Sequence, residues 1–249
     1  MDCNESNKKN KKYIQSYFGQ DRFNSSESRE VTVDMFGSQI VLRQDPCSRN
    51  LGTTVWDASI VLAKYVEKNF SGKSRVKGKT VVELGAGVSG LVGMSFALQG
   101  AHVTLTDITD AVLDTLRHNV EYNLSPATLR LNQSQMAGAV GQVNVVELDW
   151  SIPSHFERVS PPADYVVAAD CVYNEDSVSM FLDAVQALFG PRSIGLVCNE
   201  FRSESVHAEF MSKFSKHFSM KKVPSSKMDK QYIHPLIHIY ILKRLKTAV

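Results

Sequence analysis

The sequence lacks the features that mark exported, membrane-bound and zinc-binding proteins. It has no run of about 18 apolar residues and no apolar leader at its start. Its four cysteines include no Cys-x-x-Cys pair, and its seven histidines show no zinc-like spacing. An excess of one charge is also absent, because 28 Lys and Arg against 26 Asp and Glu leave a formal net charge of +2. We therefore expect a cytoplasmic or partly nuclear, metal-free monomer that binds neither nucleic acid nor membranes.

The chain divides into a polar start and one α/β domain. Residues 1–28 are poor in aliphatic side chains and cannot bury enough surface to offset the entropy of ordering, so we expect a flexible tail. Its lysine run at 8–12 is either a solvated segment or a nuclear or docking signal. Residues 29–249 can bury one full core, since 43% of the sequence is hydrophobic. Apolar runs at 31–33 and 40–42 around Gly37 predict a hairpin at its start.

Alternating strand and helix patterns then predict the fold. A helix follows Gly52, with apolar residues at helical spacing through Phe70. We expect strands at 79–83, 102–106, 143–147, 164–169 and 193–198, and helices at 89–99, 109–122, 176–189 and 203–215. Repeated β-α-β units specify a parallel sheet with helices on both faces. Two final strands, at 217–223 and 236–242, have no helix between them and predict an antiparallel hairpin at the sheet edge.

A glycine loop gives the first functional indication. Residues 81–90 read Val-Val-Glu-Leu-Gly-Ala-Gly-Val-Ser-Gly, a Gly-x-Gly-x-x-Gly pattern directly after an apolar strand. Gly85 and Gly87 allow the backbone to approach a ligand, and the next helix directs N–H groups into the same cleft. Asp107 ends the following strand, where its carboxylate can accept hydrogen bonds from both ribose hydroxyls of a nucleoside. These features alone fit a nicotinamide dinucleotide as well as a sulfonium nucleoside.

Charge distinguishes the two ligands. The carboxylate of Glu83 would repel a pyrophosphate over the loop, whereas S-adenosylmethionine has no phosphate and carries a cationic amine and a sulfonium. Asp149 and Trp150 follow the third strand, where an indole can stack on adenine and a carboxylate can accept from its exocyclic amine. Core packing is the alternative reading for Trp150. The sequence therefore predicts S-adenosylmethionine as the cofactor.

Several of these segments carry a family resemblance. Residues 83–87, 106–107 and 148–150 resemble the cofactor motifs of the Rossmann-like seven-β-strand methyltransferases. Residues 55–62 and 169–173 narrow the resemblance to protein-lysine methyltransferases that modify chaperones and related ATPases. Within that group, residues 56–65, the Asp170 segment and residues 238–241 most resemble the branch that methylates valosin-containing protein, an AAA-type ATPase. The resemblance covers roughly residues 30–245.

The resemblance implies an activity and a set of site residues. It implies a seven-stranded sheet, methyl transfer from S-adenosylmethionine to a lysine, and a protein substrate that is a chaperone-class or AAA-type ATPase. The residues that it places on the cofactor are Trp56, Glu83, Gly85, Gly87, Asp107, Trp150 and Ala169. Asp170 and Tyr173 match its Asp-x-x-Tyr motif. The segment 199–202, Asn-Glu-Phe-Arg, departs from the nearest relatives, which carry Tyr before the Glu and Gln after it. Substrate identity is accordingly less fixed than cofactor identity.

Lysine chemistry suits the strand ends that carry these residues. A lysine amine with a pKa of about 10.4 must lose a proton before it attacks the methyl group. Asp170 and Tyr173, after the fourth parallel strand, can hold the ammonium and orient the amine. Spacing does not decide which of them, or water, takes the proton, and the alternative is a helix-entry residue and a packing residue. Glu200 and Arg202, after the fifth strand, are predicted to bind substrate or to pair with each other.

Other reaction classes leave different marks at this position. Amino-methylases of adenine or glutamine carry two prolines there, and Asp170-Cys171-Val172-Tyr173 has none. We expect Cys171 and Cys198 to pack as small buried groups. A methyltransferase for a small molecule or nucleic acid, and a catalytically silent cofactor-binding partner protein, remain the alternatives.

Overall fold

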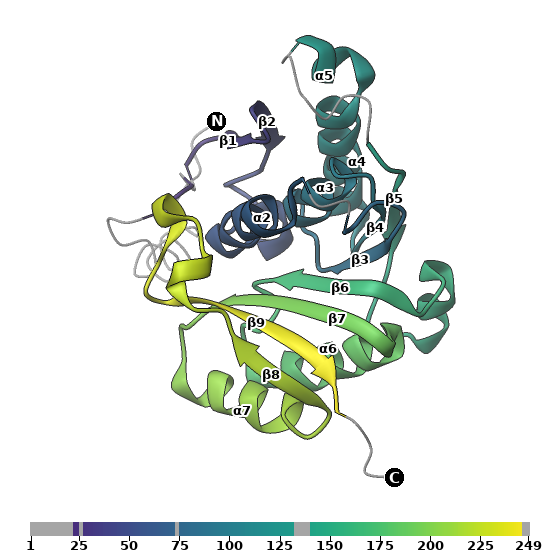
Figure 1. Ribbon diagram of the computed structural model, residues 1–249, viewed down its shortest axis with the longest axis vertical. Helices are drawn as coiled ribbons and strands as arrows, with labels where there is room; N and C mark the ends of the chain where they lie inside the picture. Colours follow the sequence, from purple (N-terminus) through teal and green to yellow (C-terminus); the bar gives the residue numbers. More distant parts are fainter. Residues whose placement is uncertain (1–21, 25–26, 73–74, 132–139, 246–249) are drawn as a thin grey trace.

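A computed structural model describes residues 22–24, 27–72, 75–131 and 140–245. Its main sheet has seven strands in the order β5-β4-β3-β6-β7-β9-β8 (Figure 1). The strands are β3 (Thr80–Leu84), β4 (His102–Asp107), β5 (Val143–Glu147), β6 (Ala163–Ala169), β7 (Phe189–Glu200), β8 (Phe218–Lys222) and β9 (Ile237–Arg244). The first five are parallel, and β9 runs antiparallel to both β7 and β8. The predicted sheet of five parallel strands and a C-terminal antiparallel hairpin is confirmed, with β9 on the inner side of the hairpin.

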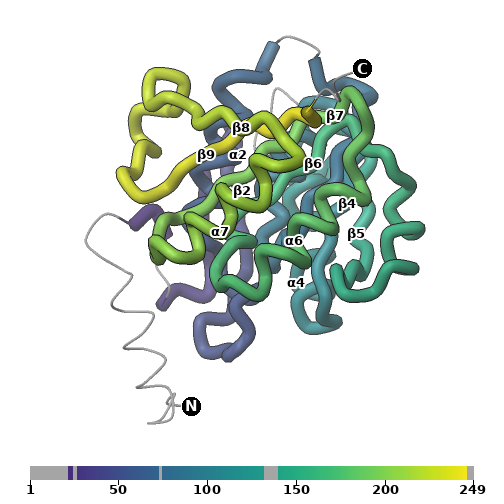
Figure 2. The backbone as a smooth tube through the Cα atoms, turned by 90° about the horizontal axis from the view of Figure 1, so that it is seen from below, coloured from purple at the N-terminus to yellow at the C-terminus, as the bar shows by residue number. Residues whose placement is uncertain are grey.

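Helices cover both faces of the sheet, as predicted. Helices α2 (Asp57–Phe70), α3 (Leu91–Ala97) and α4 (Asp110–Leu124) pack on one face, and α6 (Glu175–Leu188) and α7 (Glu204–Phe214) on the other. Successive strand residues point to opposite faces. Val81 therefore joins the core under α2 and α3, while Val82 joins the core under α6 and α7. Figure 2 shows α6 and α7 together on the side of the sheet that faces the viewer.

The predicted N-terminal hairpin forms a separate two-stranded sheet of β1 (Glu30–Met35) and β2 (Ser38–Arg43). It is fixed to α4 by two buried amides. The Asn123 Oδ1 accepts from the Val41 backbone N–H at 2.8 Å, and the Asn119 Oδ1 accepts from that of Arg43 at 2.9 Å. Because backbone N–H groups of β2 hydrogen-bond to side chains of α4, the hairpin packs on the helical layer and not on the main sheet.

Short helices occupy the connections. They are η1 (Leu51–Thr53), α5 (Pro126–Leu131), η2 (Pro153–Val159), η3 (Ser225–Lys227) and η4 (Lys230–Tyr232). Part of the connection between the helix expected at 109–122 and the strand expected at 143–147 is thus helical. Gly190 and Pro191, which follow the helix expected at 176–189, lie inside β7, because that strand begins directly after α6 and pairs Phe189 with Ala163. Pro191 is exposed there, so its missing N–H leaves no buried partner unsatisfied.

The N-terminal boundary differs from the simple tail expected for 1–28. Residues 1–21 of that prediction lie outside the described residues. Arg22, Phe23 and Asn24, however, pack on the domain, and Asn24 is buried. Its side-chain amide donates to the Val55 carbonyl at 2.5 Å and to Gln44 Oε1 at 3.2 Å. Within the described part of the chain, no helix is long and apolar enough to cross a membrane.

Candidate active site

The predicted cofactor residues gather in one pocket of about 240 Å³ at the carboxyl ends of β3, β4 and β6. All eight line it: Trp56, Glu83, Gly85, Gly87, Asp107, Asp149, Trp150 and Ala169. Asp170 and Tyr173 line the same pocket, whereas Glu200 and Arg202 do not. In a parallel sheet the carboxyl ends meet at one edge, so residues far apart in sequence converge there.

Both loop glycines are required by the backbone. Gly85 and Gly87 have φ angles of 60° and 57°, which are costly for residues with a Cβ. A Cβ on Gly85 would lie 2.7 Å from the Cys171 Sγ, and one on Gly87 would lie 2.9 Å from the Gly52 carbonyl oxygen. Cys171 is buried beneath the loop and its Sγ lies 3.2 Å from the Leu84 carbonyl oxygen, in agreement with the packing role predicted for it. The loop therefore offers bare backbone to a ligand.

Asp107 is held in place by the loop that it faces. Its Oδ2 accepts a hydrogen bond from the Gly87 N–H at 2.8 Å, and its Oδ1 accepts one from the Ile108 N–H at 2.8 Å. Burial raises the pKa of this carboxyl, and the two backbone hydrogen bonds oppose that rise. Each oxygen keeps lone-pair capacity for a further donor. Both oxygens of the carboxylate therefore remain able to accept from a ligand in the pocket.

Glu83 lies deeper than a strand-tip carboxylate was expected to lie. It is 1% exposed, and its Oε2 accepts from the Gly93 N–H of α3 at 2.6 Å. Burial raises its pKa to about 8, and the nearby Asp107 adds to the rise. A cation in the pocket would favour the ionised form. Gly93 was not predicted: a Cβ there would lie 2.8 Å from Glu83 Oε2, and its only sequence signal is a glycine inside an apolar helix.

Trp150 serves the core and the pocket together. Its ring lies 5.4 Å from that of Phe181, and it also lines the pocket, so the packing alternative and the ligand role are compatible. Its neighbour Asp149 accepts at Oδ1 from the Ser151 N–H at 2.8 Å and the Ser151 hydroxyl at 2.6 Å. These bonds lower the pKa of Asp149. The turn therefore presents an ionised carboxylate and an indole face.

A chain of buried charges lies next to the pocket. The Asp170 oxygens accept from Arg202 Nη1 at 2.9 Å and Nη2 at 2.5 Å. Arg202 Nη2 also donates to Glu200 Oε2 at 2.8 Å, and its guanidinium lies over the Trp56 ring, 5.1 Å from the ring centre. Glu200 in turn binds Arg22, which reaches Asp57 at 3.3 Å. The predicted pair of Glu200 and Arg202 thus exists within a larger set that the sequence did not indicate.

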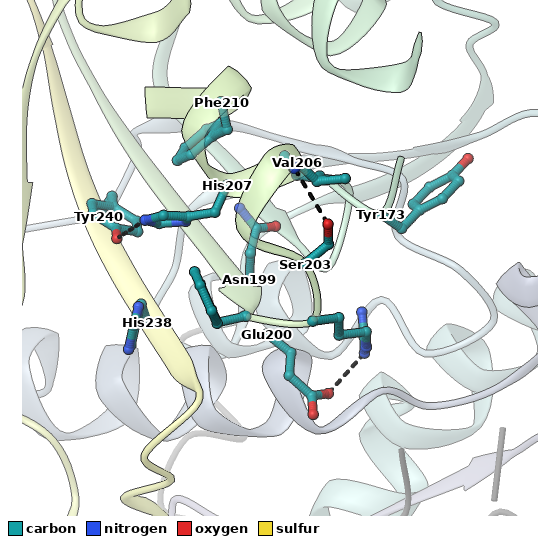
Figure 3. A pocket seen from close by; sticks show the side chains of 12 residues that line it. Tyr173, Asn199, Glu200, Ser203, Val206, His207, Phe210, His238 and Tyr240 are labelled. Carbon is teal, nitrogen blue, oxygen red and sulfur yellow. Dashed lines mark hydrogen bonds and ion pairs between the residues drawn. The ribbon is translucent and has the colours of Figure 1, made fainter. Parts of the chain in front are cut away.

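Within this network, Asp170 is buried and paired with Arg202. Its side chain is 2% exposed and both of its oxygens bond to Arg202. Its φ of 61° is unusual for a residue other than glycine, and its N–H donates to the Cys198 carbonyl at 2.7 Å. Tyr173, by contrast, is 51% exposed. Of the two motif residues, Tyr173 is the one accessible to a substrate, and Figure 3 shows its hydroxyl directed away from Asn199 and Glu200.

Comparison with known proteins decides the family. The family described as "Lysine methyltransferase" matches residues 36–217. The chain belongs to the lysine methyltransferase family. It is 35% identical over 194 residues to the mouse "Protein N-lysine methyltransferase METTL21A", covering 78% of this chain and 80% of the relative. It is also 30% identical over 227 residues to the Xenopus tropicalis "EEF1A lysine methyltransferase 3", covering 90% of each.

Solved structures agree on the fold of this lysine methyltransferase. The T. Thermophilus "16S rRNA N2 G1207 methyltransferase (RsmC)" bound to AdoMet and guanosine aligns with a TM-score of 0.56 at 15% identity, over 87% of this chain and 50% of that one. A predicted O-methyltransferase from Agrobacterium tumefaciens aligns with a TM-score of 0.51 at 15% identity, over 75% and 80%. At such identities the likeness concerns the fold alone.

The enzyme is an S-adenosylmethionine-dependent protein-lysine N-methyltransferase, as the family resemblance implied. The glycine cradle, the oriented Asp107 and the deep Glu83 fit that cofactor. The relatives support the lysine methyltransferase family and do not single out the branch that methylates valosin-containing protein. The matched segment 36–217 contains every predicted site residue, whereas Arg22 lies upstream of it.

Proposed function

We propose that this lysine methyltransferase modifies a folded chaperone-class or AAA-type ATPase, and that Tyr173 meets the target lysine. The observation that carries the proposal is the position of Tyr173, half exposed on the rim of the pocket that the cofactor residues line. A protein lysine can reach this rim from solvent. The buried carboxylates beside it cannot be reached without moving Arg202 or Arg22.

The cofactor residues take distinct roles in this proposal. Asp107 binds the ribose hydroxyls, Trp150 and Asp149 bind the adenine, and Glu83 with the glycine loop faces the cationic methionine end. Trp56 and Ala169 complete the walls. When bound, the cofactor supplies a methyl group on a positively charged sulfur. This chain orients that methyl towards the rim where Tyr173 stands and limits the access of water.

Tyr173 orients the lysine amine as it loses its proton and attacks the methyl carbon. The nitrogen–carbon bond forms as the sulfur–carbon bond breaks, and the proton passes to solvent. Asp170 acts together with Arg202 and Glu200. The set of Asp57, Glu200 and Asp170 with Arg22 and Arg202 has three carboxylates and two guanidiniums, so it carries one surplus negative charge when all are ionised. That surplus favours an approaching ammonium.

The substrate class is tested with labelled cofactor and cell extract. Methyl-labelled S-adenosylmethionine should label a protein that is identified as a chaperone-class or AAA-type ATPase. Mass spectrometry should place the label on a lysine. Purified chaperones, AAA-type ATPases and EEF1A are then compared, because the name of one relative specifies EEF1A. Label found only in EEF1A would contradict the ATPase proposal. Label found in RNA or a metabolite would support the small-molecule or nucleic-acid alternative, and cofactor binding without labelling would support the silent-partner alternative.

A further inference from the structure

A second, smaller pocket of about 20 Å³ lies at the same edge of the sheet, on the side of α7 (Figure 3). Tyr173 lines both this pocket and the cofactor pocket. The small pocket is therefore adjacent to the rim where we place the target lysine. Nothing in the cofactor arrangement uses it.

Asn199 lies in this pocket with its amide unsatisfied. The residue is 8% exposed, and among the described residues neither its Oδ1 nor its Nδ2 has a hydrogen-bond partner. It is the penultimate residue of β7 and pairs with His238 of β9, so both side chains face α7. A primary amide both donates and accepts hydrogen bonds. Its complement is a small group that also does both.

The walls of the pocket are largely aromatic, and its two charged residues, Glu200 and Arg202, already pair with each other at 2.8 Å. His207 and Phe210 come from α7, His238 and Tyr240 from β9, and Phe201 follows β7. Burial lowers the pKa of His207 and of His238, and the charge of Lys222 adds to the effect. With its charged residues already paired and its histidines neutral, the pocket favours a neutral group over an ionised one.

We propose that this pocket binds the hydroxyl of a serine or threonine that flanks the target lysine in the protein substrate. A hydroxyl donates and accepts hydrogen bonds, as the Asn199 amide requires. It is also the size of a water oxygen, which needs about 10 to 15 Å³ of such space. The inference rests on the proposed function, because it needs a protein lysine at Tyr173. An extended segment advances about 3.3 Å per residue, so a residue within three positions of the lysine can enter the adjacent pocket.

The test is a double-mutant cycle between enzyme and substrate. The protein labelled in extract is purified and its methylated lysine is mapped. A serine or threonine within three positions of that lysine is then replaced by alanine or valine, respectively. With the wild-type enzyme, kcat/KM for the altered substrate should fall about fivefold to tenfold, mainly through KM. With Asn199→Leu, the same substrate change should alter kcat/KM less than about twofold, because the hydrogen bond is already absent.

Two controls keep the result interpretable. Asn144→Leu changes an exposed asparagine on β5, at the opposite edge of the sheet, and should retain the full effect of the substrate change. The melting temperature of Asn199→Leu without substrate should stay unchanged or rise by about 2 to 4 °C, because an unsatisfied buried amide is replaced by an apolar group. A fall of more than about 4 °C would show that Asn199 is a structural residue, held for instance by a fixed water, and would overturn the proposal.

Failure of this inference is distinguishable from failure of the proposed function. If no protein becomes methylated, the lysine transfer itself is wrong. If a lysine is methylated but no serine or threonine lies within three positions of it, the hydroxyl pocket is wrong. If such a residue is present and the wild-type and Asn199→Leu enzymes lose the same factor on its replacement, the pocket is also wrong, and the lysine assignment still stands.

Discussion

Arg22 donates two hydrogen bonds to Glu200 across 178 positions of sequence, from Nη1 to Oε2 at 2.8 Å and from Nη2 to Oε1 at 2.7 Å. The same guanidinium reaches Asp57 in the first turn of α2. Arg22 therefore joins the start of the helix that follows Trp56 to the end of β7. Because Arg22 lies upstream of the segment matched by the family, it contacts the end of β7 from outside that segment.

Replacing Arg22 by Ala should reduce the free energy of unfolding by about 3 kcal/mol, because it leaves the carboxylates of Glu200 and Asp57 buried with fewer partners. Their side chains are 3% and 2% exposed. Arg22→Lys should recover part of the loss, since an ammonium keeps the charge but cannot form the two parallel bonds. Chemical denaturation followed by circular dichroism measures both variants.

Arg117→Ala is the matched control. Arg117 forms an ion pair with Asp114 at 2.8 Å, but their side chains are 45% and 75% exposed. Its loss should cost less than about 0.5 kcal/mol. Equal losses for Arg22→Ala and Arg117→Ala would show that the Arg22 pair contributes no more than a surface contact.

Glu83 should make the ligand-free protein less stable as the pH rises. Its folded pKa of about 8 lies above the ordinary value of 4.5, so the folded state keeps a proton that the unfolded state releases. The free energy of unfolding should therefore fall between pH 4.5 and about 8 and level off above it, by up to about 5 kcal/mol. Denaturation of the wild-type protein and of Glu83→Gln across this range measures the effect.

The glutamine variant isolates Glu83 from Asp57 and Asp107, whose pKa values burial also raises. The substituted amide would be neutral at every pH and could still accept from the Gly93 N–H. The difference between the two stability curves should thus grow from pH 4.5 to about 8. A constant difference would mean that Glu83 does not titrate in this window.

Replacing Asp107 by Ala should weaken cofactor binding by about 1.5 to 3 kcal/mol, because two charge-assisted hydrogen bonds to the ribose are lost. It also frees the Gly87 N–H that Asp107 now accepts from. Calorimetric titration with S-adenosylmethionine measures the change. Unchanged affinity would remove Asp107 from the site, and tight binding of a nicotinamide dinucleotide by the wild-type protein would overturn the reading of Glu83.

Replacing Tyr173 by Phe should lower kcat by about 100-fold or more and leave both the melting temperature and cofactor affinity unchanged. The ring of this half-exposed residue stays and only its hydroxyl is removed. Asp170→Ala should also abolish methylation with little loss of cofactor affinity, but it frees Arg202 from its partner and should lower stability as well. Melting curves accompany both kinetic measurements.

These two variants distinguish a residue that contacts the target lysine from one that holds other residues in place. A fully active Tyr173→Phe enzyme would remove the hydroxyl from the lysine site. A folded Asp170→Ala enzyme that binds cofactor and methylates at the full rate would show that the Asp-x-x-Tyr motif has no part in the chemistry.

Local patterns in the sequence were enough to predict the sheet, its helices and a set of residues that line one pocket. Glu83, the two loop glycines, Asp107 and Trp150 each lie at or just after the end of a strand, and in a parallel sheet all such positions meet at one edge. Periodicity sets the faces, and chain order sets which edge the residues share. The observed element bounds differ from the predicted ones where strand pairing continues beyond the residues with a strand-like pattern, as at Phe189, where β7 begins.

The buried ion pairs beside the pocket depend on contacts that no local pattern encodes. A carboxylate after a strand is equally able to face a pocket or an arginine, and only the folded chain brings Arg202 onto Asp170 and Arg22 onto Glu200. The tertiary structure likewise decided that Glu83 lies under α3 and that, within the described part of the chain, Asn199 is buried without a partner. The sequence determines the order of strands and helices along the chain. The direction and the partner of a buried charged or polar side chain depend on which distant groups the fold places next to it.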